Sequence, residues 1–270
     1  MTLGLLPELG GRIISLAFRD EELLFMPDDL KLPDLPLGMD VTAYKREHGL
    51  VVYGGDKTWV APEGEWGGQV PSLDLDAGIY ASANSDKAVV MTSPVCRETG
   101  LQIIRRVGFL DNGDIFLIET LRNAGINAVT KGVWNVTQIR RPLEVCIPVD
   151  ERDIRSYHHE NQTLPDPGFS PLHIDGWSII PCQGNTCFKF GAMLREGRVA
   201  VMKDTPYGKL AWARVFDIAP GKPYAHRSMI EVFNAPWQEY AEIEVHSPLT
   251  ELPPGAEVTL TQLWRLYLTV

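Results

Sequence analysis

Three short segments of the chain carry residue types that could bind a polar ligand or move protons. The first is the run YGGDKTW at residues 53–59, which is followed by Trp66. Paired glycines let a backbone approach a ligand closely, while Asp56 and Lys57 offer an acceptor and donors to hydroxyl groups. Trp59 and Trp66 would add flat apolar faces. These four are candidate ligand-binding residues, and a turn with a surface ion pair and a core tryptophan is the alternative.

The second segment, GVWNVTQ at residues 132–138, has the alternation of a strand with polar side chains on both faces. Trp134 and Gln138 would share one face and Asn135 would lie on the other. Buried amide side chains need hydrogen-bond partners, so one of these faces could line a pocket. Trp134, Asn135 and Gln138 are further candidate ligand-binding residues, with core packing as the alternative for Trp134.

The third segment combines EVFN at residues 231–234 with EIEVHSP at residues 242–248. A period of two puts Glu242, Glu244 and His246 on one face of a strand. A carboxylate in a cleft can act as a general base, with its pKa raised by partial burial, whereas on a solvated face it would have no such role. Glu244 is the candidate catalytic residue, and Glu231 is a candidate ligand-binding residue.

Two adjacent histidines, His158 and His159, follow in a later segment rich in proline. In extended chain their side chains point to opposite sides, so at most one of them would face a given pocket. Either could act as a general acid, and a surface position is the alternative. The sequence has no HxH, HExxH or CxxC pattern, so we expect no metal site.

The elements that must position these residues are strands. Apolar residues recur with period two in short runs rich in Val, Ile, Phe and Trp, which is typical of half-buried strands. The turns at residues 111–114 and 195–198 predict antiparallel hairpins. Closely spaced prolines make residues 27–49 and 157–176 long loops that could wall a cleft, with one helical turn at residues 42–47. The strands are predicted at residues 12–18, 87–92, 101–109, 115–121, 133–139, 188–194, 199–203, 210–216, 229–233, 240–245 and 257–268.

Composition bounds the class of protein. The chain has 270 residues, 44% hydrophobic and 22% charged, with no internal repeat or linker, so we expect one folded domain over residues 1–270. A formal net charge of −10 argues against a nucleic-acid partner. No run of about twenty apolar residues and no signal-peptide pattern occurs, so we expect no membrane association and a cytoplasmic location.

Three segments together resemble the galactose mutarotase superfamily, and more closely an uncharacterised bacterial branch of it. They are LPELGGRI at residues 6–13, YGGDKTW with the following Trp66, and the C-terminal IEVHSPLTELPPGAEVTLTQLWRL. The resemblance implies an all-β fold, a large antiparallel two-sheet β-sandwich. It also implies that Glu244 takes a proton from the anomeric hydroxyl while a histidine protonates the ring oxygen, without any cofactor.

This chain departs from the family at one histidine, because Trp134 and Asn135 stand where the family's His-x-Tyr-Phe type of segment would fall. His158 or His159 could supply the acid instead. Our leading hypothesis is an aldose 1-epimerase-like enzyme acting on a small-molecule carbohydrate, and the rival is a noncatalytic carbohydrate-binding protein. A polysaccharide lyase is a third alternative, for which Lys57, Lys189 and Arg140 could neutralise a uronate.

Overall fold

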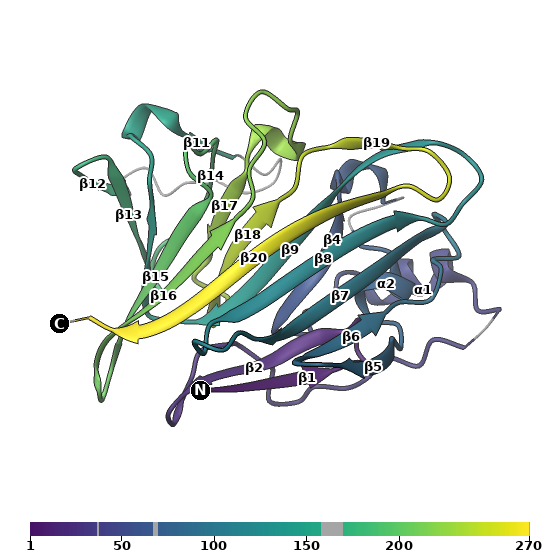
Figure 1. Ribbon diagram of the computed structural model, residues 1–270, viewed down its shortest axis with the longest axis horizontal. Coiled ribbons are helices and arrows are strands. Elements are labelled where there is room, and N and C mark those ends of the chain that lie inside the picture. Colours follow the sequence, from purple (N-terminus) through teal and green to yellow (C-terminus); the bar gives the residue numbers. More distant parts are fainter. Residues whose placement is uncertain (37, 67–69, 158–169, 270) are drawn as a thin grey trace.

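Two antiparallel sheets of ten strands each build the described part of the protein. The computed structural model describes residues 1–36, 38–66, 70–157 and 170–269. Every strand ladder in these ranges is antiparallel, as the hairpin chemistry predicts for residues 111–114, which join β7 (Leu101–Phe109) to β8 (Ile115–Asn123). Figure 1 shows the long strand β20 (Glu257–Leu268) running beside β8, with which it pairs. The predicted all-β two-sheet sandwich is confirmed.

The first sheet has the strand order β1-β2-β4-β9-β18-β17-β14-β11, with β3 paired to β2 and β19 to β9. Its strands are β1 (Thr2–Leu6), β2 (Arg12–Phe18), β3 (Glu21–Glu22), β4 (Asp56–Ala61), β9 (Val129–Arg140), β11 (Ile154–Ser156), β14 (Phe188–Ala192), β17 (Ile230–Asn234), β18 (Tyr240–His246) and β19 (Thr250–Leu252). The second sheet has the order β12-β13-β10-β15-β16-β20-β8-β7-β6-β5. Its remaining strands are β5 (Ala81–Ser85), β6 (Ala88–Thr92), β10 (Leu143–Ile147), β12 (Leu172–Ile174), β13 (Trp177–Cys182), β15 (Arg198–Thr205) and β16 (Gly208–Phe216).

Helices are short. They are α1 (Val41–His48), α2 (Leu73–Asp76) and the 3₁₀ turns η1 (Glu63–Glu65), η2 (Glu151–Asp153) and η3 (Ala225–Arg227). The predicted helical turn in the first proline-rich loop is thus α1, which Asp40 caps by accepting a hydrogen bond from the Ala43 amide. None of the helices in the described ranges is long and apolar enough to span a membrane.

The turn at residues 195–198 does not form the predicted hairpin. The strand before it, β14, pairs with β11 and β17 in the first sheet, whereas β15 pairs with β10 and β16 in the second. The Phe216 amide donates to the Gly197 carbonyl, so this turn lies against the end of β16. Residues 195–198 therefore connect the two sheets, although their types suit a hairpin, because β14 and β15 pair with strands of different sheets.

The main core lies between the sheets. Ile243 and Val245 of β18 and Leu117 and Leu121 of β8 belong to it and are buried. Because side chains alternate along a strand, the residues between these positions on β18 face away from the second sheet. The outer face of the first sheet is therefore available for a binding site.

Gly54 and Gly55 set the path of the chain into β4. Both have positive φ, +78° and +69°, and a Cβ on Gly55 would lie 2.4 Å from the carbonyl oxygen of Ile13. We expect Gly55→Ala to lower the free energy of unfolding by more than about 1 kcal/mol, measured by urea denaturation. The matched control is Gly113→Ala, where φ is +85° but no described atom lies within 4 Å of the added Cβ. Equal losses in the two variants would show that the close contact at Gly55 is unimportant.

Candidate functional site

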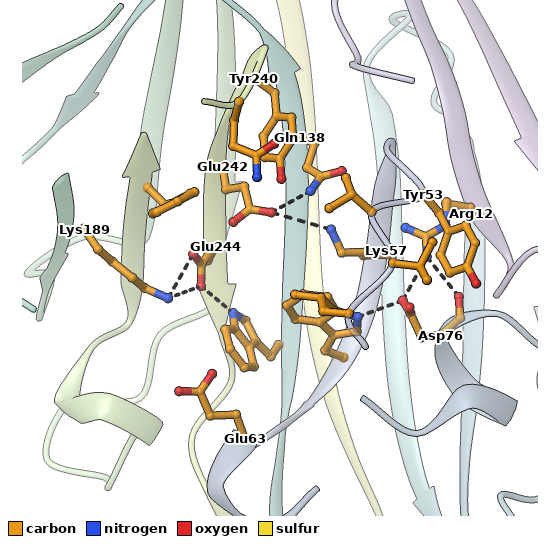
Figure 2. Close-up of a pocket in the computed structure, with 17 residues that line it drawn as sticks. Arg12, Tyr53, Lys57, Glu63, Asp76, Gln138, Lys189, Tyr240, Glu242 and Glu244 are labelled. Carbon is orange, nitrogen blue, oxygen red and sulfur yellow. Dashed lines mark hydrogen bonds and ion pairs between the residues drawn. The ribbon is translucent and has the colours of Figure 1, made fainter. Parts of the chain in front are cut away.

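A cavity of about 190 Å³ lies on the outer face of the first sheet. Strands β4, β9, β14, β17 and β18 supply its floor, and residues 50–53, Glu63 and Asp76 form its walls. Figure 2 shows Lys189 and Glu244 on one side, Arg12, Tyr53 and Asp76 on the other, and Glu242, Gln138 and Lys57 between them. Residues 50–53, which follow the first proline-rich loop, form part of a wall, whereas none of the described residues of the predicted loop at 27–49 lines the cavity.

Alternation along the strands decides which predicted residues reach this cavity. On β4 the odd positions face it and the even positions face the second sheet, whereas on β9 and β18 the even positions face it. The predicted residues that line the cavity are Lys57, Trp59, Trp134, Gln138, Lys189 and Glu244. Glu242 lies on the same face of β18 as Glu244 and also lines the cavity.

Asp56 and Asn135 were predicted as ligand-binding residues, but they lie on the opposite face and are fully buried between the sheets. Asp56 forms an ion pair with Arg105 and accepts a hydrogen bond of 2.9 Å from Asn135 Nδ2. Asn135 Oδ1 accepts another, of 2.5 Å, from Arg214. Their polar groups are satisfied within the protein, so the structure corrects this part of the prediction and assigns both residues to the core.

Trp66 and Glu231 lie behind the cavity lining. The Trp66 indole donates to the Val60 carbonyl at 2.7 Å and stacks on Trp134 with ring centroids 5.5 Å apart, so it supports Trp134 from behind. Trp59 contacts both rings edge to face. Glu231 is fully buried and contacts cavity residues without lining the cavity itself. His158 and His159 lie outside the described residues.

Glu244 is a buried carboxyl group fixed by two donors. Its Oε2 accepts hydrogen bonds of 2.9 Å from the Trp134 indole and 3.2 Å from Lys189 Nζ, and only 1% of the residue is exposed. Burial raises the pKa of this carboxyl well above its ordinary value, against the opposing charge of Lys189, and the negative charge of Glu231 adds to the increase. A carboxylate with a raised pKa is a stronger base than an exposed one.

Lys189 is shared between two carboxyl groups. Its Nζ lies 2.9 Å from Glu231 Oε2 and 3.2 Å from Glu244. Burial disfavours the ionised form of Glu231, but the charge of Lys189 and a hydrogen bond to His226 hold the pKa of this carboxyl well below its usual range. The pKa values of the two glutamates are therefore shifted in opposite directions, which leaves Glu231 ionised and makes Glu244 the carboxyl group that can take up and release a proton.

The middle of the cavity holds a second carboxyl group. Gln138 Nε2 donates to Glu242 Oε1 at 2.7 Å, and Lys57 Nζ lies 3.8 Å from the same oxygen. Lys57 Nζ also lies over the ring of Trp59, 4.6 Å from its centroid. Figure 2 shows these three polar groups converging between the two walls.

Sequence reasoning did not select the far wall of the cavity. Arg12 and Asp76 form a buried ion pair of 2.8 Å, and the Trp59 indole also donates to Asp76, at 2.7 Å. Tyr53 covers the Arg12 guanidinium at 5.5 Å, and burial raises the pKa of its hydroxyl to about 12. Arg12 and Asp76 are 64 residues apart, so no local motif joins them.

His226, Glu231 and His246 are the described residues that come nearest to a metal-ligand set, with donor atoms within 4.8 Å of one another. Burial lowers the pKa of His246 to about 3, so its ring is neutral, and it stacks on Trp134. Lys189 Nζ already lies against Glu231 and balances its charge. His226 and Lys189 thus both contact Glu231, whereas neither ring nitrogen of His246 has a hydrogen-bond partner among the described residues.

Comparison with known proteins gives a likeness in structure alone. No protein-family model matches the sequence, and no curated protein is similar to it. Among solved structures, a candidate aldose 1-epimerase from Escherichia coli K12 has a TM-score of 0.62 at 13% identity, covering 99% of this chain and 96% of the other. A galactose mutarotase-like protein from Lactobacillus casei has a TM-score of 0.60 at 11% identity, covering 98% and 96%.

A further galactose mutarotase-like protein, from Clostridium acetobutylicum, has a TM-score of 0.59 at 12% identity and covers 99% of this chain and 92% of the other. The chain therefore has the galactose mutarotase-like fold, and the resemblance drawn from its sequence is confirmed at that level. Such low identity shows the fold alone, and the reaction has to be argued from the cavity.

Proposed function

We propose that the cavity binds a small carbohydrate and interconverts its anomers, with Glu244 as the general base. The observation that carries this proposal is a buried carboxyl group, held by two donors and with a raised pKa, in the wall of a cavity that also offers tryptophan and hydroxyl-binding groups. Sugars are typically bound by an aromatic face together with convergent hydrogen-bonding groups. The galactose mutarotase-like fold supports the same assignment.

The reaction would open and reclose the sugar ring. Glu244 in its ionised form takes the proton of the anomeric hydroxyl, the bond between the anomeric carbon and the ring oxygen breaks, and a general acid protonates the ring oxygen. Rotation about the adjacent carbon–carbon bond presents the other face of the aldehyde, and the reverse transfers reclose the ring. The fixed donors Trp134 and Lys189 would hold the carboxylate in place throughout.

Three residues are candidates for the general acid. His158 and His159 remain proposed for this role, and among the described cavity residues Glu242 is the alternative, because it lies two positions from Glu244 on the same face of β18. The rate of mutarotation in Glu242→Gln distinguishes Glu242 from the histidines as the general acid. A large loss of rate would assign the acid to Glu242, and an unchanged rate would leave it to a histidine.

The proposal is tested by following the optical rotation of freshly dissolved aldoses with and without the wild-type protein. We expect acceleration, and we expect it to fall as the pH is lowered through the pKa of Glu244, because only the ionised carboxylate accepts a proton. Since that pKa is raised, the acidic limb of the pH profile should lie clearly above the ordinary glutamate value of about 4.3. Spontaneous mutarotation at each pH is the control. No acceleration across a broad panel of aldoses would refute the proposal.

A noncatalytic carbohydrate-binding protein is the second candidate. It is favoured by one observation, that no histidine is among the described residues lining the cavity. This function would show sugar binding by calorimetry, weakened in Trp59→Ala, with no change in the rate of mutarotation. The lyase alternative has less support, because Lys189 is neutralised by two carboxyl groups and Arg140 donates to backbone carbonyls of Leu24 and Met26.

A further inference from the structure

Lys57 is a buried lysine whose amine is left without a hydrogen bond. Only 4% of the residue is exposed, its Nζ has no hydrogen-bond partner among the described residues, and it faces the cavity. Its nearest acid, Glu242, lies 3.8 Å away and is hydrogen-bonded by Gln138 instead. The Lys57 amine lies near Glu242 and over the Trp59 ring, but a buried amine without a hydrogen bond is expensive to maintain, so its position calls for a functional explanation.

The two lysines of the cavity are in contrasting environments. Burial would lower the pKa of Lys189, but the charges of Glu244 and Glu231 outweigh it and raise that pKa above its ordinary value. Burial lowers the pKa of Lys57, and the charge of Arg12 adds to this decrease. The charges of Glu242, Asp76 and Glu244 oppose it without compensating. Lys189 is therefore a permanent ammonium, whereas Lys57 is the lysine that more readily offers a neutral amine. A neutral amine is a nucleophile towards carbonyl carbon.

We propose that Lys57 forms an imine with the aldehyde of a small carbonyl compound bound in the cavity, the open-chain form of an aldose being the physiological case. This inference rests on the proposed function for that case, because ring opening at Glu244 would produce the aldehyde beside Lys57. It adds a covalent step that mutarotation does not need. The protein would then hold the open-chain sugar covalently, in addition to interconverting its anomers.

The step balances without a further reactant. The Nζ lone pair attacks the carbonyl carbon, and proton transfer from nitrogen to oxygen gives a carbinolamine. Loss of its hydroxyl as water, with Glu242 placed to relay the proton, leaves a carbon–nitrogen double bond, and addition of water reverses the reaction. Gln138 Oε1 is buried and has no hydrogen-bond partner among the described residues, so it is free to accept from the carbinolamine hydroxyl.

Reductive trapping on the native protein tests the proposal. The wild-type chain is incubated near neutral pH with glycolaldehyde and sodium cyanoborohydride, then digested and mapped by mass spectrometry. We expect Lys57 to gain the mass of the aldehyde less one oxygen atom, at least about tenfold faster than the exposed Lys222, because its amine is positioned and less protonated. Modification of Lys222 with none at Lys57 would overturn the proposal.

Two variants and a second aldehyde complete the design. Lys57→Met, which keeps an unbranched side chain only one atom shorter, should abolish the fast labelling, and Lys222→Met should leave it unchanged. Glycolaldehyde is too short to form a sugar ring, so its labelling does not depend on ring opening. Fast labelling by glycolaldehyde without any acceleration of mutarotation would therefore support Lys57 and refute the proposed function, while the converse result would refute Lys57 alone.

Discussion

Glu244→Gln is expected to lower the rate of catalysed mutarotation by about 10²–10⁴-fold, the usual contribution of a general base. Glutamine keeps the size of the side chain and can still accept the hydrogen bond of 2.9 Å from the Trp134 indole, so the fold should be retained. What it loses is the ability to take up a proton. The rate is measured from the optical rotation of a freshly dissolved aldose that the wild-type protein accelerates.

Glu251→Gln is the matched control, because Glu251 is an exposed glutamate on β19 outside the cavity lining. It should retain the wild-type rate. Near-ultraviolet circular dichroism of both variants checks that the tryptophan cluster is intact. If Glu244→Gln keeps half or more of the wild-type acceleration while the fold is unchanged, Glu244 is not the base.

The largest expected effect on stability concerns the ion pair that the structure places between the sheets. Arg105 is fully buried, pairs with Asp56, donates to the Gly11 carbonyl at 2.7 Å and lies 3.6 Å from Glu119. Arg105→Met would leave two buried carboxyl groups without their main cation. Removing one partner of a buried pair typically costs about 3–5 kcal/mol, and we expect a loss of that size in the free energy of unfolding.

The adjacent Arg106 provides the control, because it lies on the same strand but is exposed. Arg106→Met should change the free energy of unfolding by no more than about 0.5 kcal/mol. Arg105→Lys, which keeps a charge but loses the planar fork, should fall between the two. Urea denaturation at neutral pH measures all three. A loss below about 1 kcal/mol in Arg105→Met would show that the network between the sheets contributes little to stability.

The period-two pattern predicted most central strands well, because alternation is a local property that survives in any sheet with one buried face. The strand at residues 101–109 and the one at residues 257–268 have the predicted bounds. Strands with weaker patterns were missed, among them β4, which contains the last four residues of the YGGDKTW motif, and β10. These segments form strands because they pair with neighbouring strands in the sheet. Such pairing can compensate for a weak pattern of alternation in the segment itself.

Alternation also limited what could be said of the site. It grouped Trp134 with Gln138 and set Asn135 apart, but it could not tell which face would meet the second sheet. On β18 the apolar side chains of Ile243 and Val245 identify the face that packs in the core. The prediction that Glu242 and Glu244 share the other face is therefore correct. On β4 and β9 both faces carry polar groups, so the pattern does not identify the buried face. The prediction that Asp56 and Asn135 bind a ligand is wrong for this reason, because both are buried in the core.

The amino-acid sequence by itself determined the all-β class, the antiparallel pairing at residues 111–114 and the residues that share a strand face with Glu244. Tertiary structure alone decided which faces became core, and it brought Arg12 to Asp76 and Trp134 to Glu244 across 64 and 110 residues. It also placed Lys189 between two carboxyl groups and left Lys57 Nζ without a hydrogen bond among the described residues. The reason is physical: the pKa and partners of a buried group depend on which distant strands cover it, and no local spacing encodes that.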